Sequence, residues 1–248
     1  MLEAKKFEPL FEKGWWDKIG GFFETEQAEE IYKFLKERSR SGNTIFPSSD
    51  LTFRAFKETP YKDLKCLIIA MEPYSNRYNK VPIADGLALS CGLTKRIQPS
   101  LQTFLDAIEN DCYKGLDFDK DSNYDLTRLA SNGVLLTNVS LTVEENKIGS
   151  HSSKGLWLPF WEYTLNILNS CNSSLHYCLL GKEAQKLEKW ILPFNNYIYK
   201  ENHPSFYART NSDWNTKMFS NINKIIEQNN GKSERITWFK EDDSDLPF

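Results

Sequence analysis

Three apolar stretches of the chain each end in a polar residue that could take part in a reaction. Glu72 follows residues 67–71, Asn138 closes residues 133–138, and His203 comes shortly after residues 196–200. A carboxylate can take a proton, an amide both donates and accepts hydrogen bonds, and an imidazole can donate one. In open α/β sheets, ligand sites collect at the carboxyl ends of the strands. These three residues therefore predict a single active site.

Helical and strand patterns alternate along the chain, which is typical of an α/β protein. Short apolar runs predict strands at residues 65–71, 133–138, 176–180 and 196–200. Helical periodicity predicts helices at about 26–40, 51–57, 101–108, 157–168, 183–191 and 216–228, and Ser100 is a suitable N-cap for the third of these. Continuous apolar strands indicate a mostly parallel sheet that is covered on both faces. We predict one α/β domain over residues 1–240, with a central, mostly parallel four-stranded sheet flanked by helices.

The composition is that of an ordinary globular protein, with 40% hydrophobic and 26% charged residues among 248. The formal net charge of −3 gives no general basic signature, although an acidic protein can still carry a local basic groove. Five cysteines without a C-x-x-C pair and only three histidines argue against a metal site. No signal region or membrane-length apolar run is present, so we expect a cytoplasmic monomer with no membrane contact. Residues 241–248 are expected to form an acidic tail.

Short motifs follow one another in a fixed order along nearly the whole chain. They lie at residues 42–47, 53–56, 72–75, 98–101, 133–143, 150–151, 179–186, 203–205 and 236–238. Together they resemble the uracil-DNA glycosylase superfamily, and within it family 1. The resemblance implies that family's fold and its reaction, in which water cleaves the N-glycosidic bond of a flipped-out pyrimidine and leaves an abasic site. It implies DNA, single- or double-stranded, as the partner, a protein inhibitor of uracil glycosylases as a further one, and no cofactor.

The resemblance assigns catalytic roles to Glu72 and His203. As the bond breaks, positive charge grows on the sugar and negative charge on the base. Glu72 is expected to orient and deprotonate water on the sugar side. His203, held neutral or nearly so, is expected to donate a hydrogen bond to the pyrimidine O2. The family has aspartate where this chain has Glu72, and the extra C–C bond adds roughly 1.5 Å of reach.

Four residues are expected to bind the base. Asn138 can pair with either a uracil or a cytosine edge, depending on the orientation of its amide. Tyr74 matches the family's tyrosine that crowds the pyrimidine C5 and excludes thymine. Leu89 stands where the family has a stacking phenylalanine, and Met71 where it has glutamine. Ser75 replaces a histidine, so the catalytic loop differs from the family pattern at several positions.

The resemblance also implies which loops contact DNA. The expected phosphate contacts are Ser100, Lys182, Ser205 and Arg209, and Lys182 replaces a serine of the family. Phe206 and Tyr207 follow the motif that opens the insertion loop, with Tyr207 at the position of the wedge that enters the duplex. His151 is expected to support a loop, and His176 to be structural.

Three functions remain open from the sequence. The first is removal of uracil. The second is removal of a modified pyrimidine, such as a glucosylated hydroxymethylcytosine of phage DNA, in antiviral defence; Leu89 and the altered catalytic loop favour it, whereas Tyr74 argues against a large C5 group. The third is a catalytically weak module that binds DNA or a protein partner, against which the carboxylate of Glu72 argues.

Overall fold

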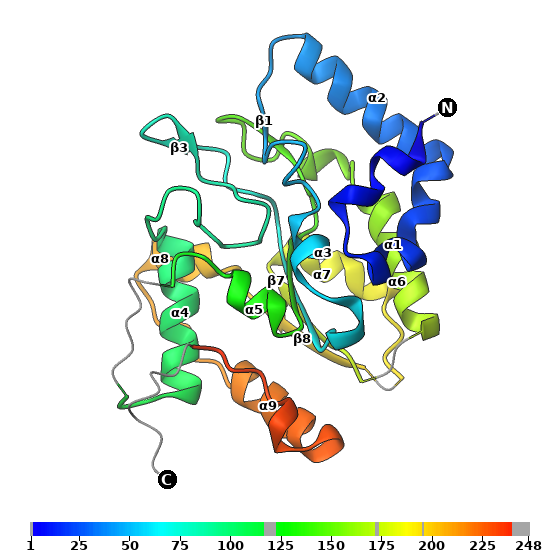
Figure 1. The fold of residues 1–248 in the computed structure, drawn as a ribbon. Helices are drawn as coiled ribbons and strands as arrows, with labels where there is room; N and C mark the ends of the chain where they lie inside the picture. Colours follow the sequence, from blue (N-terminus) through cyan, green and yellow to red (C-terminus); the bar gives the residue numbers. More distant parts are fainter. Residues whose placement is uncertain (1, 117–122, 172–173, 195, 240–248) are drawn as a thin grey trace.

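A four-stranded parallel sheet forms the centre of the computed structural model, which describes residues 2–116, 123–171, 174–194 and 196–239 (Figure 1). The strand order is β5-β2-β7-β8, and every neighbouring pair is parallel. The strands are β2 (Cys66–Ala70), β5 (Val134–Asn138), β7 (His176–Leu180) and β8 (Tyr197–Glu201). The predicted α/β class and parallel sheet are confirmed, and each predicted strand lies within two residues of its observed bounds.

Burial explains why these runs form strands. Every residue of β2, β5 and β7 is buried, so both faces of these strands are covered, as their continuous apolar sequences indicate. The edge strand β8 is only partly buried. The free thiols of Cys66, Cys91 and Cys178 are buried in this core.

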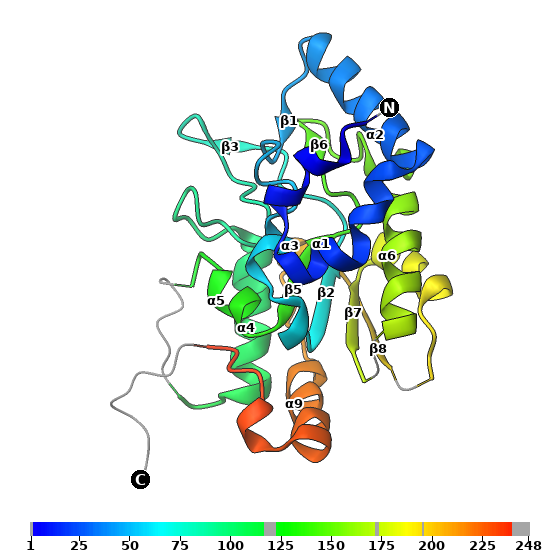
Figure 2. The same ribbon diagram turned by 45° about the vertical axis from the view of Figure 1, so that its right-hand side comes forward.

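Two groups of helices lie on either side of the sheet. On one side, α1 (Lys13–Ile19) and α2 (Glu26–Arg40) both contact α6 (Leu158–Cys171); on the other, α8 (Pro204–Thr210) and α9 (Met218–Asn230) both contact α4 (Pro99–Cys112). Figures 1 and 2 show the first group to the right of the sheet and the second to its left and below. The shorter helices α3 (Arg54–Glu58) and α5 (Thr127–Ser131) pack on β5, and α7 (Lys182–Gln185) packs on β7 and β2.

The first 25 residues form an aromatic layer that the sequence pattern does not predict. Here α1 and the 3₁₀ turn Gly20–Glu24 bury aromatic side chains against α3 and α6. Trp15, for example, meets the ring of Phe56 edge-on at 5.0 Å. Burying such a side chain contributes roughly 1.5–3 kcal/mol. These elements are too short to produce a helical period of their own.

Two small antiparallel pairs of strands lie beyond the carboxyl edge of the sheet. β1 (Ile45–Phe46) pairs with the distant β6 (Val143–Glu144), and β3 (Arg77–Tyr78) forms a hairpin with β4 (Val81–Pro82). The β3–β4 hairpin turns through Asn79 and Lys80, whose φ angles are +47° and +68°. Two successive positive φ angles are the signature of a tight hairpin turn that matches the twist of its strands.

The helix boundaries differ from the prediction at two places. The helix predicted at 183–191 is α-helical only over Lys182–Gln185 and continues as a 3₁₀ helix over Lys186–Trp190. Helix α4 begins at Pro99 with Gln98 as its N-cap residue, so the prediction that Ser100 caps this helix is wrong. Proline suits the first turn because its missing N–H has no partner there in any case. Helix α9 ends at Asn230 with Gly231 as its C-cap, two residues beyond the predicted end of 228. The expected acidic tail at 241–248 lies outside the described residues. Within the described part of the chain, no helix is long and apolar enough to cross a membrane.

Candidate active site

The carboxyl edge of the sheet brings together the ends of all four strands. Ala70 of β2 pairs with Asn138 at the end of β5, and Leu180 of β7 pairs with Glu201 at the end of β8. Glu72 and His203 each follow their strand by two residues. Because neighbouring strands lie about 4.8 Å apart, β2 and β8 are separated by roughly 10 Å at this edge. The sheet therefore gathers the three predicted strand ends on one side of the molecule.

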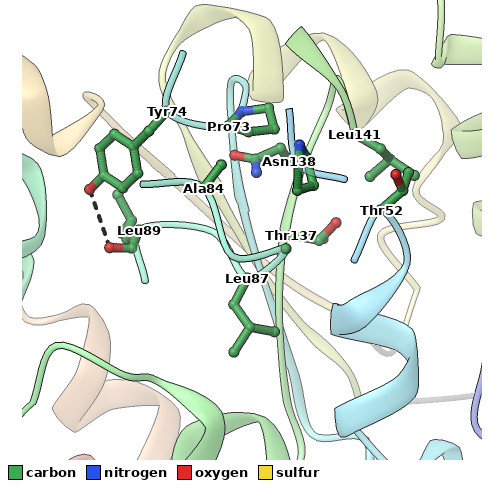
Figure 3. A pocket seen from close by; sticks show the side chains of 11 residues that line it. Thr52, Pro73, Tyr74, Ala84, Leu87, Leu89, Thr137, Asn138 and Leu141 are labelled. Atoms are coloured by element: carbon green, nitrogen blue, oxygen red, sulfur yellow. Dashed lines mark hydrogen bonds between the residues drawn. The ribbon is translucent and has the colours of Figure 1, made fainter. Parts of the chain in front are cut away.

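A narrow slot opens at this edge beside β5 (Figure 3). It encloses about 320 Å³, including the open space at its mouth. Little of this space is free of the lining atoms, so the slot is narrow. It is lined by Pro47, Thr52, Pro73, Tyr74, Ala84, Gly86, Leu87, Leu89, Thr137, Asn138 and Leu141.

Three of the four residues predicted to bind a base line this slot directly. These are Tyr74, Leu89 and Asn138, whereas Met71 does not line it; Met71 and Glu72 precede the lining residue Pro73. Four of the other lining residues, Pro47, Pro73, Thr137 and Leu141, belong to the motifs at 42–47, 72–75 and 133–143, and the rest lie outside the motifs. Thr52 and Thr137 add hydroxyl groups that the sequence reasoning missed.

Asn138 presents an amide without a protein partner to the slot. Its side chain is nearly buried, with 6% of the residue exposed, and no hydrogen bond engages the amide within the described residues. The backbone carbonyl of Asn138 accepts a hydrogen bond from the Trp161 indole at 3.1 Å, which fixes the position of the residue. Buried polar groups are normally paired. A free amide in a slot is therefore suited to a ligand that supplies the missing partners.

The phenol of Tyr74 is held by two hydrogen bonds at the opposite side of the slot. It donates to the Leu89 carbonyl at 3.2 Å, the contact drawn in Figure 3, and lies 2.8 Å from the Ser100 hydroxyl. Burial raises the pKa of Tyr74 well above its usual value of 10, so the phenol stays neutral. Leu89 itself has a φ of +66°, which is strained for a branched side chain. Such strain persists where surrounding contacts enforce it, often at functional sites.

A buried carboxylate, Asp85, holds the segment that carries Leu89. It accepts hydrogen bonds from the Leu87 and Gly92 amides and from the Ser90 hydroxyl. The Arg54 guanidinium lies 3.1 Å from the same carboxylate and balances its charge. The sequence reasoning missed Asp85; an aspartate next to a glycine at a turn was the available signal.

The carboxylate of Glu72 is bound by the loop that follows β6. The Gly149 amide donates to both of its oxygens, at 2.8 and 3.1 Å, and the Ser152 hydroxyl donates to one of them at 2.7 Å. Burial raises the pKa of Glu72 above its usual value of 4.5, and the hydrogen bonds from Ser152 and Gly149 oppose that rise. The longer side chain is thus tethered in one orientation.

His203 is held as a neutral ring with a defined tautomer. It is the N-cap of α8, where its Nδ1 accepts the Ser205 amide at 3.1 Å and lies 2.9 Å from the Ser205 hydroxyl. Burial lowers the pKa of His203 to about 4, with a further contribution from the charge of Arg209. Because Nδ1 accepts a backbone N–H, the single proton of the neutral ring belongs on Nε2. That N–H can donate a hydrogen bond to a ligand.

The other two histidines do not line the slot. His151 is fully buried, and its Nδ1 lies 2.8 Å from the Thr142 hydroxyl inside the loop that it was expected to support. His176 is buried in β7, where its ring stacks on Tyr197 at 4.8 Å. Within the described residues, His, Cys, Asp and Glu do not gather in a group of three that could hold a metal ion.

The residues expected to contact DNA differ in how exposed their side chains are. Lys182, at the start of α7, is exposed and forms no ion pair within the described chain, and Arg209 is exposed with its guanidinium 3.2 Å from Ser205 Oγ. Ser100, by contrast, is buried with its hydroxyl turned toward Tyr74. That orientation leaves its side chain inaccessible to a phosphate unless the contact with Tyr74 breaks.

The two aromatic residues of α8 also differ. Tyr207 stacks on Trp214, with ring centroids 5.7 Å apart and planes within 10° of parallel. Phe206 is 42% exposed and touches Tyr207 edge-on. The structure therefore favours Phe206 over Tyr207 as the side chain that protrudes from this helix.

The fold and the site together define a class of protein. A parallel α/β sheet carries at its carboxyl edge a narrow slot with a free amide, and the same edge holds a tethered carboxylate and a neutral imidazole. This arrangement suits hydrolysis of a bond whose leaving group gains negative charge, since the carboxylate can activate water and the imidazole can stabilise that charge.

Comparisons with known proteins agree with this class. Residues 56–227 match the family described as the uracil DNA glycosylase superfamily. The chain is 34% identical over 227 residues to a uracil-DNA glycosylase of Pseudomonas paraeruginosa, covering 92% of this chain and 94% of that protein. A uracil-DNA glycosylase of Borreliella burgdorferi is 33% identical over 220 residues, which cover 88% of this chain and 95% of that protein. The chain belongs to the uracil-DNA glycosylase superfamily.

Solved structures give the same fold. The crystal structure of mimivirus uracil-DNA glycosylase superposes with a TM-score of 0.79 at 21% sequence identity, over 95% of this chain and 89% of that one. A variant of the same viral protein, crystallised in complex with UGI, also superposes with a TM-score of 0.79.

Proposed function

We propose that this protein is a uracil-DNA glycosylase, a hydrolase that removes uracil from DNA and leaves an abasic site. Membership of the superfamily over most of the chain supports this activity. The single observation that carries the chemistry is His203, a neutral imidazole with its proton on Nε2 at the same sheet edge as the Glu72 carboxylate.

The reaction assigns opposite tasks to these two residues. Glu72 takes a proton from water while the water oxygen bonds to C1′ of the sugar and the C1′–N1 bond breaks. The electron pair of that bond leaves with the base, and His203 Nε2–H donates to the uracil O2, where negative charge develops. Pre-aligned donors of this kind typically contribute about 10²–10³-fold to the rate.

The slot beside β5 is proposed to select the base. The Asn138 amide pairs with the O4 and N3–H edge of uracil and so gains the partners that the protein does not supply. Tyr74, fixed by Leu89 and Ser100, closes the position next to C5. The narrow shape of the slot supports a single unsubstituted ring and argues against a glucosylated hydroxymethylcytosine.

We propose that the loops at the ends of β7 and β8 contact DNA. Lys182, Arg209 and Ser205 bind phosphates, and Phe206 is the better candidate for the wedge that keeps the duplex open, because it is more exposed than Tyr207. A protein inhibitor of uracil glycosylases is proposed to bind this same face, since a related viral enzyme was crystallised with UGI. The monomeric state and cytoplasmic location remain predictions.

Release of free base from matched duplexes tests the proposal. The duplexes carry uracil, thymine, cytosine, hydroxymethylcytosine or glucosylated hydroxymethylcytosine at one position, and Glu72→Gln serves as the control. Release of uracil that depends on Glu72 is the expected result. Release only from a modified cytosine would identify that base, and not uracil, as the substrate. Binding without release from any duplex would indicate that the protein is a DNA-binding module.

A further inference from the structure

The carboxylate of Glu72 is held by a loop with little regular structure of its own. Gly149 and Ser152, which donate to this carboxylate, belong to residues 145–152, and we call this segment the tether loop. Between β6 and the 3₁₀ turn Ser152–Lys154 the loop consists mainly of turns. Because turns supply few internal hydrogen bonds, contacts with other segments have to hold the two donors in place.

Glu144, the residue before the tether loop, is bonded to the middle of it. The amide of Glu144 donates to the Ser150 hydroxyl at 2.9 Å, and its carboxylate accepts a hydrogen bond from the Lys147 ammonium at 2.8 Å. The side chain of Glu144 is only 3% exposed, so its negative charge needs partners within the protein. A movement of Glu144 would therefore move the residues on both sides of Gly149.

Arg38 of α2 supplies the main partner of this buried charge. Its Nε lies 2.5 Å from one oxygen of Glu144, and its Nη2 lies 3.1 Å from the other. Such a two-point contact fixes orientation as well as distance. The hydrogen bond from Arg38, opposed by burial, lowers the pKa of Glu144 to about 2, so this carboxylate stays charged. The His151 Nε2 lies 3.8 Å from Glu144, and burial lowers the pKa of that ring.

Helix α2 is a suitable anchor for the loop. It packs on α6 and buries Ala28 and Ile31, and Figure 2 shows its end leading into β1, the partner of β6. Asn43, just beyond the helix, donates from its side-chain amide to the Arg38 carbonyl at 3.1 Å. Its side-chain oxygen accepts a hydrogen bond from Lys147 at 2.6 Å. The end of α2 and the tether loop are thus joined at two points.

We infer that Arg38 and Glu144 are positioning residues for the reaction, and that their ion pair holds the tether loop in the shape that bonds Glu72. Neither residue lines the slot, so they act through the loop and not on the base. The inference rests on the proposed function and deepens it, since the proposed reaction requires an ionised Glu72 in a fixed orientation. It connects α2, which contributes no residue to the slot, with the catalytic carboxylate.

A double-mutant cycle tests the inference. Arg38→Met removes the guanidinium but keeps the apolar stem, and Glu144→Gln removes the negative charge with little change of shape; the double variant completes the cycle. Arg38→Lys keeps the positive charge without the two-point geometry. The matched control is Arg40→Met, because Arg40 lies in the same last turn of α2, is exposed and forms no ion pair within the part of the chain that the structure describes.

Two quantities are measured for each variant. One is the pH dependence of kcat at saturating uracil duplex. The other is the pKa of the Glu72 carboxyl, followed by ¹³C NMR with the spectrum of Glu72→Gln to assign the signal. The thermal unfolding midpoint is recorded beside them.

Each single variant is expected to raise the pKa of Glu72 and to move the acid limb of kcat to higher pH, because a displaced loop no longer opposes the effect of burial. We expect kcat to fall about tenfold, less than the hundredfold expected for a displacement of about 1 Å. KM should change less than about twofold, since contacts with the base and the phosphates are kept. The double variant should be no worse than either single variant, and Arg38→Lys should lie between Arg38→Met and the parent.

A lower unfolding midpoint without a change in the pKa of Glu72 would mean that the ion pair is only structural, and would overturn the inference. A shift in Arg40→Met as large as that in Arg38→Met would also overturn it. If Arg38→Met does not fold, Arg38→Lys and Glu144→Gln provide the same comparison.

The NMR measurement separates this inference from the proposed function, because it does not depend on turnover. A parent protein that releases no uracil, but whose Glu72 pKa rises in the Arg38 and Glu144 variants, would contradict the glycosylase activity and support the hold of the ion pair on Glu72. Uracil release with an unchanged Glu72 pKa in these variants would support the glycosylase activity and contradict the positioning role.

Discussion

Glu72 and His203 occupy equivalent positions at the ends of β2 and β8, yet burial acts on their chemistry in opposite ways. Burial favours the neutral form of both: it raises the pKa of the Glu72 carboxyl above 4.5 and lowers the pKa of the His203 imidazole to about 4. The proposed reaction needs a neutral His203 and an ionised Glu72. Burial therefore assists the imidazole and opposes the carboxylate.

The hydrogen bonds around the two residues reflect this difference. His203 receives its defining bond from Ser205, two positions along the same helix start, and that bond fixes a tautomer. Glu72 receives donors from Gly149 and Ser152, which stabilise an anion against the effect of burial. A site with one charged and one neutral group thus needs added donors only at the charged group.

Of the substitutions that test this difference, replacing Glu72 should have the largest effect on the rate of base release. Glu72→Gln keeps the shape of the side chain but removes the base, so we expect base release to fall by about 10²–10⁴-fold. Binding to an abasic duplex should be nearly unchanged. Single-turnover rates and anisotropy measure the two quantities, and unchanged turnover would remove Glu72 from the mechanism.

Replacing His203 should have the next largest effect. His203→Ala removes the donor to the departing base, and we expect kcat to fall by about 10²–10³-fold. It also removes the N-cap acceptor of α8, which costs about 1 kcal/mol of stability, so the unfolding midpoint must be followed as well. His203→Gln restores an N–H donor and should recover part of the rate; equal losses in both variants would mean that the donor has no role.

Removing one hydroxyl beside Glu72 should have an intermediate effect. Ser152→Ala deletes a donor that lowers the pKa of Glu72, so the acid limb of the kcat profile should move to higher pH. Activity is lost as pH falls through the Glu72 pKa, because the protonated carboxyl cannot take a proton from water. We expect kcat to fall roughly three- to tenfold, less than the hundredfold expected for a displacement of about 1 Å.

The matched control for that variant is Ser153→Ala. Ser153 lies next in the chain and is exposed, and its hydroxyl bonds to the Gly149 carbonyl rather than to Glu72. Its removal should leave the acid limb in place. A shift of equal size in the two variants would mean that the loop as a whole, and not the donor to Glu72, sets the profile.

Removing one hydroxyl beside His203 should have the smallest effect. Ser205→Ala leaves the backbone amide of residue 205 bonded to Nδ1, so the tautomer persists and kcat should change less than about twofold. KM should rise if the hydroxyl also binds phosphate. Both variants are measured at saturating uracil duplex. A loss of kcat as large as that of Ser152→Ala would contradict the proposed difference between the hydrogen bonds at Glu72 and those at His203.

The sequence alone predicted most of the fold. The four central strands and the helices α2, α4, α6 and α9 are long or strongly patterned, and their predicted bounds lie close to the observed ones. The aromatic layer of the first 25 residues, the β1–β6 pair and the β3–β4 hairpin were missed, because each element is only a few residues long.

The polar residues at the ends of the strands, and the motifs that resemble the superfamily, were determined by the sequence itself. So was the tautomer of His203, since its partner lies two residues away at the start of α8, whereas the low pKa of this ring comes from burial in the folded chain. Only the tertiary structure decided the tether of Glu72, because Ser152 is 80 residues away in the chain. The Asp85 carboxylate and Arg54, likewise, meet only in the folded chain, and the stacking of Tyr207 on Trp214 depends on where the segment after α8 packs. Local hydrogen bonds are encoded by neighbouring residues, whereas contacts between distant segments exist only after packing has brought those segments together.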